Sequence, residues 1–277
     1  MQVYRDLRIL TARPDDAALA AAPHRLYGFL DAADICSAAR WAELAAAETR
    51  AALDAGRLPI VVGGSGLYFR ALTEGFSPIP DIAPEHRAEA ADRLAALGGE
   101  AFRAELARVD AETAARLHAG DSQRLVRAME VWLGTGRPLS EWQKLPPEPP
   151  PLDLDFLTVA LLPERETLYA RCDARFGDML AAGAMAEVQA LAARGLDPEL
   201  PAMKALGVPQ LIAAGRGEIT LDEAAEKART LTRRYAKRQV TWLRHQIVAD
   251  IADDAQHLER MSARIFPKIR EFRLTAR

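Results

Sequence analysis

The sequence predicts an α/β fold interrupted by an all-helical insertion, and three stretches carry this prediction. Residues 58–62 form a short apolar run, rich in β-branched residues, that ends at a glycine-rich turn. Such a run is typical of a buried strand that leads into a helix. Residues 154–162 form a second strand candidate, whereas residues 79–152 show helix patterns and no strand candidate. We therefore expect an α/β core whose sheet resumes after the insertion.

The glycine-rich turn, Gly63-Gly64-Ser65-Gly66, leaves two interpretations open. Glycines let backbone N–H groups approach an anionic or planar ligand, and the N-terminus of a helix starting at Leu67 adds partial positive charge. Alternatively, the glycines serve only the steric needs of a strand-to-helix turn. The residues of the turn do not separate these two interpretations.

The composition places the chain among ordinary globular proteins. It has 277 residues, of which 49% are hydrophobic and 27% charged, and a net charge of −3. No apolar run approaches the ~20 residues that span a bilayer, so we expect a cytoplasmic protein without membrane association. Cys36 and Cys172 lie far apart without metal or redox spacing, which predicts two reduced, structural thiols.

We expect three segments along the chain. Residues 1–78 form the first part of the core, residues 79–152 the helical insertion, and residues 153–277 the second part of the core. The insertion ends in a proline-rich linker. In the first segment, residues 23–30 are expected as an edge strand or a loop, and Ser37 as the N-cap of a helix that ends near Ala55.

The other expected helices follow from apolar periodicity and from the residues that interrupt it. They cover residues 86–97, 100–109, 111–117, 122–133, 167–182, 184–194 and 202–214, followed by a long helix that opens at Thr220. Thr220 and Glu223 have the spacing of a capping box. Two strands are too few for an α/β sheet of this size. Either the strand predictions are poor, or a piece of the fold precedes Met1, and we expect the second.

The strongest local signal is a basic helix at residues 227–244. It holds seven basic residues and no acidic one: Lys227, Arg229, Arg233, Arg234, Lys237, Arg238 and Arg244. At 100° per residue these fall within one half of the helix, opposite Ala228, Leu231, Tyr235, Trp242 and Leu243. A solvated charged face normally mixes signs. The absence of acids therefore favours binding of a nucleic acid or polyphosphate.

Two further basic sets are candidate binding groups. Arg116, His118, Arg124 and Arg127 surround a helix start at which Gln123 and Arg124 carry donors and acceptors suited to a base edge. Singly, such residues are more often caps or surface groups. Arg171 and Arg175 lie one helical turn apart and could clamp a diphosphate, or could instead pair with Asp173 and Asp178.

Several enzyme classes lack their motif in this sequence. There is no G-x-x-x-x-G-K-[ST] phosphate loop, the turn at Ser65 lacks the final glycine of a G-x-S-x-G nucleophile elbow, and the five histidines show no zinc spacing. We therefore expect neither metal-independent nucleophilic catalysis nor a zinc centre.

Taken in order, short motifs along the chain resemble those of the tRNA dimethylallyltransferase family. They are Met1-Gln2-Val3-Tyr4-Arg5, Thr11-Ala12-Arg13-Pro14, Pro23-His24-Arg25-Leu26, Val62-Gly63-Gly64-Ser65-Gly66-Leu67-Tyr68, Asp121 to Ala128, Arg175-Phe176 with Met179-Leu180, Met203 to Gly207, and Lys237 to Arg244. The resemblance implies a P-loop-NTPase-like core with an insertion that grips the anticodon stem-loop. It also implies transfer of a dimethylallyl group from dimethylallyl diphosphate, with Mg²⁺, to N6 of adenosine 37 in tRNAs reading codons that begin with U.

The resemblance also implies site residues. Ser65, where the family usually has threonine, and Arg175, the diphosphate-side arginine, are the implied catalytic residues. The implied tRNA contacts are Met1, Gln2, Ser65, Arg87, Gln123, Arg124, Leu125, Val126, Arg127, Lys204, Ala205, Leu206, Gly207, Val208, Pro209, Lys237, Arg238, Gln239, Val240, Thr241, Trp242, Leu243 and Arg244.

The sequence departs from the family pattern at its start. In the family, the phosphate loop with its Mg²⁺ site, and an Asp-Ser pair whose aspartate is the general base, lie upstream of the residues that match Met1 and Gln2. We therefore expect this chain to be inactive or weakly active as given, and to be a monomer. The alternative is a non-catalytic fragment that binds the tRNA anticodon loop. Prenylation of free adenine nucleotides is disfavoured by the basic helix and the insertion.

Overall fold

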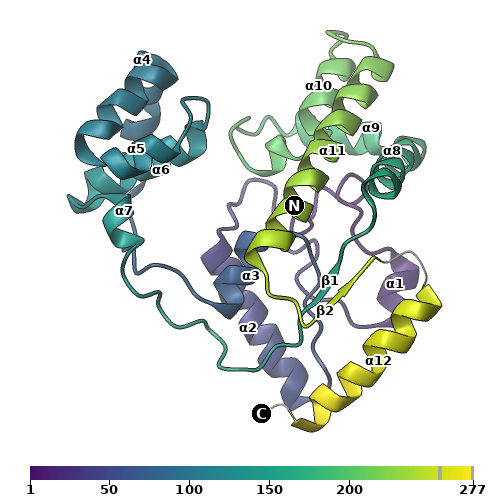
Figure 1. The fold of residues 1–277 in the computed structure, drawn as a ribbon. Coiled ribbons are helices and arrows are strands. Elements are labelled where there is room, and N and C mark those ends of the chain that lie inside the picture. Colours follow the sequence, from purple (N-terminus) through teal and green to yellow (C-terminus); the bar gives the residue numbers. More distant parts are fainter. Residues whose placement is uncertain (255–257, 276–277) are drawn as a thin grey trace. The chain divides into compact units, whose positions relative to one another are not determined.

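The computed structural model describes residues 1–254 and 258–275, and it divides the chain into two compact units. One unit comprises Met1–Leu72 and Leu152–Arg277, and the other comprises Thr73–Pro151. Figure 1 shows the course of the chain through both units. No helix among the described residues is long and apolar enough to cross a membrane.

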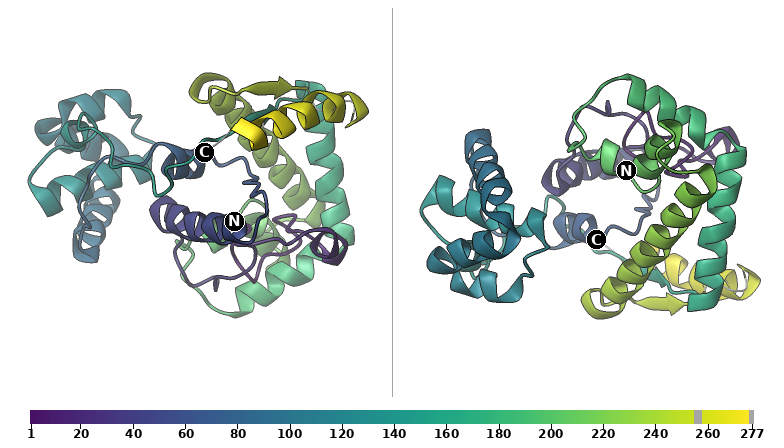
Figure 2. Two further views of the ribbon diagram at one scale, coloured as in Figure 1. Left: turned by 90° about the horizontal axis from the view of Figure 1, so that it is seen from below. Right: turned by 90° about the horizontal axis from the view of Figure 1, so that it is seen from above.

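The described part of the larger unit is mostly helical, with one small sheet. Its elements are α1 (Asp16–Ala21), α2 (Ala38–Asp54), α3 (Gly66–Thr73), β1 (Val159–Leu161), α8 (Arg165–Ala181), α9 (Ala184–Ala193), η1 (Ala202–Lys204), α10 (Val208–Gly215), α11 (Leu221–Gln246), β2 (Ile251–Asp253) and α12 (Leu258–Thr275). β1 and β2 pair in parallel, with Val159 opposite Ile251. Helix α8 packs along α11, as both views of Figure 2 show.

The two predicted helix caps are present. Ser37 accepts a hydrogen bond from the backbone N–H of Arg40 at 3.1 Å, at the N-terminus of α2. At the start of α11, the Thr220 hydroxyl accepts from the N–H of Glu223, and the Glu223 carboxylate accepts from the N–H of Thr220. These caps satisfy first-turn N–H groups that have no partner within the helix.

The strand predictions were largely wrong. Residues 58–62 form no strand, and Ile60 and Val62 are 73% and 70% exposed. Branched apolar residues favour an extended backbone, but a strand needs a partner, and among the described residues no segment pairs with this one. Of the strand expected at 154–162, only the three residues of β1 form a strand. Its partner β2 lies near the C-terminus, where no strand was expected. Residues 23–30 form a loop with one isolated bridge, between Tyr4 and Leu30.

One predicted helix, at 202–214, is broken in the structure. η1 and α10 are separated at Gly207, whose φ of 94° is a left-handed conformation that side chains rarely adopt. A Cβ at Gly207 would lie 3.1 Å from Leu10 and 3.2 Å from Phe176. Gly207 thus lets the N-terminal segment and α8 approach α10, inside the core cluster of this unit.

The N-terminal segment is tied to α9 by two side chains. The Glu187 carboxylate accepts hydrogen bonds from the backbone N–H groups of Arg8, Ile9 and Leu10, at 2.6, 2.7 and 3.0 Å. The Arg194 guanidinium bridges Asp6 and Asp31, at 2.6 Å to each carboxylate. A segment with almost no secondary structure is therefore fixed by charge-assisted hydrogen bonds.

The smaller unit is helical in its described residues: α4 (Pro84–Val109), α5 (Ala111–Arg116), α6 (Ser122–Thr135) and α7 (Leu139–Trp142). The two helices predicted at 86–97 and 100–109 form one kinked helix, with Gly98 at φ 75° and ψ 162° inside it. Asp110 is 2% exposed and accepts from the N–H groups of Thr113 and Ser140, both at 3.0 Å. Burial raises the pKa of Asp110, but these hydrogen bonds outweigh it and hold the pKa below its usual value.

Candidate nucleic-acid interface

Helix α11 presents a basic face to solvent. Its buried residues are Ala224, Ala225, Ala228 and Ala236, and small side chains there allow α8 and α10 to pack closely against the helix. Five basic side chains of α11 are exposed: Lys227, Arg234, Lys237, Arg238 and Arg244. We call these five residues the basic face. The guanidinium of Arg238 lies 5.6 Å from the ring of Tyr235, a cation–π contact that orients it.

Two of the seven predicted basic residues do not belong to this face. Arg233 donates to both carboxylate oxygens of Asp173 on α8 at 2.8 Å, and to Glu226 at 3.0 Å. Glu226 and Asp173 hold the pKa of Arg233 above its usual value. Arg229 lies 3.9 Å from Glu226, and its Nε is buried without a hydrogen-bond partner among the described residues. Arg233 therefore ties α11 to α8 through Asp173, whereas Arg229 pairs with Glu226 within α11.

Two open hollows follow the basic face. The larger, of about 650 Å³, is lined by Arg234, Lys237, Arg238, Thr241, Trp242, His245 and Gln246. The other, of about 480 Å³, is lined by Gln210, Glu223, Glu226, Lys227, Thr230, Leu231 and Arg234. Arg234 belongs to both linings. A strand of phosphates lying along α11 would meet positive charge over most of the helix.

The glycine-rich turn packs directly against α11. The Gln239 amide donates to the carbonyl oxygen of Gly64 at 3.0 Å, and a Cβ at Gly66 would lie 2.2 Å from the indole of Trp242. The close approach that these glycines permit is to side chains of this protein. This contact supports the steric interpretation of Gly64 and Gly66, while Ser65 between them is exposed.

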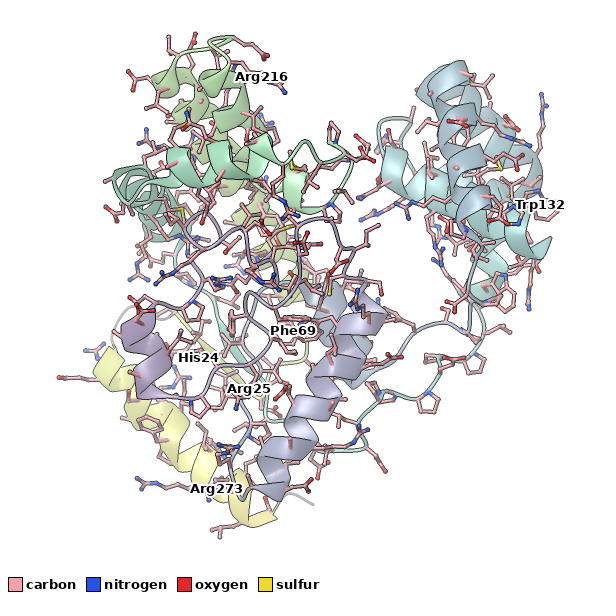
Figure 3. All side chains as sticks on the ribbon, turned by 180° about the vertical axis from the view of Figure 1, so that it is seen from behind. His24, Arg25, Phe69, Trp132, Arg216 and Arg273 are labelled. Carbon is pink, nitrogen blue, oxygen red and sulfur yellow. The ribbon has the colours of Figure 1, made fainter. Side chains whose placement is uncertain are left out.

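Helix α3, which follows the turn, is anchored on α2. The Tyr68 hydroxyl donates to the carbonyl of Cys36 at 2.9 Å, and its ring meets Trp41 edge to face at 5.3 Å. Burial raises the pKa of Tyr68 to about 12, so the hydroxyl remains a hydrogen-bond donor at physiological pH. Phe69, labelled in Figure 3, lies 3.9 Å from the position that a Cβ on Gly63 would take. The turn is thus fixed from both sides.

The N-terminal segment is also ordered internally. The Gln2 amide donates to the carbonyl oxygens of Thr11 and Ala12, both at 3.1 Å. The Arg13 guanidinium donates to the carbonyl of Tyr4 and covers Gly28, where a Cβ would clash with it. Further along this segment, Arg25, labelled in Figure 3, reaches Glu48 of α2 at 3.4 Å. The donor of Gln2 is therefore used within the protein.

The helical unit has its own cluster of polar residues at the start of α6. Gln123 and Arg124 are exposed, with Arg124 3.4 Å from Asp121. Arg127 donates to Glu130 at 2.7 Å, and Arg87 of α4 lies 3.9 Å from the second oxygen of Glu130. Arg116, expected to face a ligand, instead donates to Gln143 and Thr113.

The implied tRNA contacts divide into three groups by exposure. The side chains of Leu125, Ala205 and Val208, together with Gly207, are buried, and contact of these four positions with tRNA stays a prediction. The part-buried residues are Gln2, Val126, Arg127, Leu206, Gln239, Val240, Trp242 and Leu243. The exposed residues are Met1, Ser65, Arg87, Gln123, Arg124, Lys204, Pro209, Lys237, Arg238, Thr241 and Arg244. The buried ones belong to hydrophobic cores, which explains why they accompany exposed neighbours in the motifs.

Arg171 and Arg175 are exposed on α8. Among the described residues neither forms an ion pair within 4.0 Å, whereas their expected alternative partner Asp173 is paired with Arg233. Cys172 lies between them, and burial raises the pKa of its thiol. Arg171 and Arg175 are therefore free to meet an anion from solution.

Two functional candidates escaped the sequence reasoning. The Glu130 carboxylate accepts a hydrogen bond from Arg127, one of the implied tRNA contacts. The Glu187 carboxylate accepts one from the backbone N–H of Arg8, in the N-terminal segment. Glu130 stands three residues after Arg127 on α6, a spacing that indicates a helical ion pair. Nothing in the sequence indicates the partners of Glu187, which lie far away in the chain.

A basic face along a long helix and exposed arginines on a second helical unit are typical of a protein that binds a polyanion. The model of the IPP transferase family matches residues 2–246. A tRNA dimethylallyltransferase of Rhodospirillum centenum is 56% identical over 249 residues, covering 90% of this chain and 79% of the relative. One of Rhodopseudomonas palustris is 57% identical, covering 89% of this chain and 77% of the relative.

Solved structures of tRNA-modifying transferases are also similar to this chain. A tRNA delta(2)-isopentenylpyrophosphate transferase of Staphylococcus epidermidis is similar with a TM-score of 0.65 at 28% identity, covering 98% of this chain and 88% of that one. A eukaryotic dimethylallyltransferase acting on tRNA is similar with a TM-score of 0.75 at 26% identity, covering 97% of this chain and 69% of that one. The chain belongs to the IPP transferase family.

Proposed function

We propose that this chain is a tRNA dimethylallyltransferase that modifies N6 of adenosine 37 in the anticodon loop. The observation that carries the proposal is the match to the family over residues 2–246, with 56% identity to a named tRNA dimethylallyltransferase. The family's substrates, tRNA and dimethylallyl diphosphate, are the proposed substrates. We also propose a cytoplasmic monomer with a P-loop-type core in residues 1–78 and 153–277 and an RNA-gripping insertion in residues 79–152.

The proposed tRNA binding is supported by exposed basic side chains. Arg234, Lys237, Arg238 and Arg244 stand on α11, where their charges are not neutralised by a described acidic neighbour within 4.0 Å. Phosphate contacts of this kind supply most of the affinity for a nucleic acid and make it depend on salt. Gln123 and Arg124, at the start of α6, are the proposed groups for reading a base edge.

The proposed transfer of the dimethylallyl group from its diphosphate depends on Arg175, with Ser65 as the second proposed catalytic residue. In the reaction, N6 of adenosine forms a bond to C1 of the allyl group, the bond from C1 to the diphosphate oxygen breaks, and N6 loses a proton. The leaving diphosphate gains negative charge in the transition state. A guanidinium such as that of Arg175, which is exposed and without an ion-pair partner in the described chain, would stabilise this charge.

Mg²⁺ is expected from the family, but the described residues form no cluster of acidic side chains that fits it. Among the described residues no three His, Cys, Asp or Glu side chains form a group that could hold a metal ion. Residues 1–277 also contain no G-x-x-x-x-G-K-[ST] motif. These two observations favour a second candidate, in which a polypeptide of residues 1–277 binds the tRNA anticodon loop without catalysing the transfer.

Removing positive charge from the basic face tests the proposed RNA binding. The variant Lys237→Gln/Arg238→Gln/Arg244→Gln is expected to bind an anticodon stem-loop roughly tenfold or more weakly at moderate salt. Its affinity should also depend less steeply on salt: the negative slope of log affinity against log salt should shrink in magnitude by about 2, at about 0.7 per lost phosphate contact. Fluorescence anisotropy over a salt series measures both quantities.

Arg233→Gln is the matched control for this variant. It removes one cation from the same helix, but Arg233 is paired with Asp173 and Glu226. It should lower the unfolding midpoint and leave the salt slope unchanged. Equal slopes for the triple variant and the unmodified chain would show that the basic face does not contact RNA.

A further inference from the structure

Glu130 is a buried carboxylate held between two arginines of the helical unit. Its side chain is 6% exposed, whereas those of Arg127 and Arg87 are 43% and 61% exposed. One oxygen, Oε1, accepts a hydrogen bond from Arg127 at 2.7 Å. The other, Oε2, lies 3.9 Å from Nη1 of Arg87 and has no hydrogen-bond partner among the described residues.

Burying this carboxylate is costly, and the compensation is incomplete. A buried carboxylate is normally paired and hydrogen-bonded at both oxygens, and a buried oxygen without a partner costs free energy. An apolar side chain at this position of α6, the helix that supplies Leu125, Met129 and Val131 to the core of this unit, would avoid that cost. A role exerted through its two arginine partners would account for the carboxylate.

The geometry places both guanidinium groups where they can act outward. Each arginine has five N–H donors in a fixed planar arrangement, and Glu130 uses one from Arg127 and attracts one end of Arg87. The remaining donors belong to side chains that are about half exposed. On α6, Arg127 and Glu130 share a helix stripe with Gln123, four residues before Arg127, so this stripe runs from a base-reading candidate to a buried anchor.

We propose that Glu130 is a positioning residue, which fixes the guanidinium groups of Arg87 and Arg127 in the orientation that binds RNA phosphates. The inference rests on the proposed function, because the arginines are its proposed tRNA contacts. Two cations around one anion leave a net positive charge, so the site still attracts phosphate. Fixing the side chains beforehand reduces the rotamer entropy lost when RNA binds.

A double-mutant cycle tests this inference. Glu130→Gln keeps the shape of the side chain and removes its charge. In the full chain it is expected to raise the Kd for an anticodon stem-loop about five- to tenfold, an interaction of the size found between coupled residues. In the background Arg87→Gln/Arg127→Gln, the same substitution should change the Kd less than twofold. Glu130→Asp, which keeps the charge, should recover part of the affinity.

Glu141→Gln is the matched control, because Glu141 forms a comparable pair with Arg137, at 3.2 Å, on the surface of the same unit. It should leave the Kd unchanged. Thermal unfolding of every variant separates lost folding from lost positioning, since a purely structural role would lower the midpoint and give the same loss of affinity in both backgrounds.

The outcomes distinguish this inference from the proposed function. An unchanged Kd in Glu130→Gln, or an equal loss in both backgrounds, overturns the role of Glu130 while RNA binding stands. If the unmodified chain does not bind the stem-loop, or if Arg87→Gln/Arg127→Gln binds it as well as the unmodified chain does, the RNA contacts proposed for this unit fail, and the inference fails with them.

Discussion

The substitution Gly66→Ala is expected to lower the free energy of unfolding by about 2–3 kcal/mol, the upper part of the range of about 1–3 kcal/mol found for overpacked interiors. The new Cβ would lie 2.2–2.3 Å from three ring atoms of Trp242, so the indole would have to shift from its contact with the turn. The higher helix propensity of alanine, at most about 1 kcal/mol, does not offset this clash. Denaturant unfolding followed by circular dichroism measures the change.

Gly64→Ala is the matched control for Gly66→Ala. Its Cβ would also lie 2.2 Å from a neighbour, but that neighbour is the terminal amide of Gln239, which can rotate away at the cost of one hydrogen bond. We expect a loss of about 1 kcal/mol. Combining Gly66→Ala with Trp242→Leu should recover part of the stability. Equal effects of the two alanine substitutions would contradict the rigid contact between Gly66 and Trp242.

Glu187→Ala is expected to destabilise the protein by about 2–4 kcal/mol, since hydrogen bonds to a charged group contribute about 1.5–3 kcal/mol each and partial solvation recovers some of the loss. Three backbone N–H groups, of Arg8, Ile9 and Leu10, would lose their acceptor at once. Because Gln2 is held by the carbonyl oxygens of Thr11 and Ala12 in the same loop, RNA binding should weaken as well.

Thermal unfolding and stem-loop binding measure the two consequences of Glu187→Ala. Glu218→Ala is the control: Glu218 pairs only weakly with Arg216, at 3.8 Å on the surface, so its loss should be within about 0.5 kcal/mol. A Glu187→Ala variant as stable as the Glu218→Ala variant would show that the N-terminal loop does not depend on this carboxylate.

Most helices of the fold were predictable from the sequence because their determinants are local, but α1, α7 and α12 were missed. Ser37 and the pair of Thr220 and Glu223 mark helix starts through hydrogen bonds to residues three positions away. The strands were not predictable, because a strand requires a partner that the sequence does not identify. β1 pairs with β2 from a distant part of the chain, while residues 58–62, with the stronger strand pattern, pair with nothing in the described structure.

The candidate site, too, was predictable where its determinants are local and not where they are contacts between distant segments. The charge of the α11 helix is visible in the sequence, since its basic residues recur at helical spacing. Which of them face solvent is decided by α8, whose Asp173 takes Arg233 out of the basic face. The glycine-rich turn was ambiguous for a similar reason, because the groups that approach Gly64 and Gly66 come from α11, far along the chain. Contacts between distant segments are thus the part that sequence reasoning missed.

We propose that residues 1–277 hold the anticodon stem-loop through exposed cations and, without a G-x-x-x-x-G-K-[ST] motif, do not transfer the group rapidly. The most direct test measures two quantities on one polypeptide of these residues with Mg²⁺ present: salt-dependent binding of a stem-loop with adenosine at the modified position, and transfer of a labelled dimethylallyl group to it. We predict salt-dependent binding, with transfer absent or far slower than that of a related transferase assayed alongside. Failure to bind the stem-loop would contradict the RNA interface, and transfer at the rate of the related enzyme would contradict the account of the missing phosphate site.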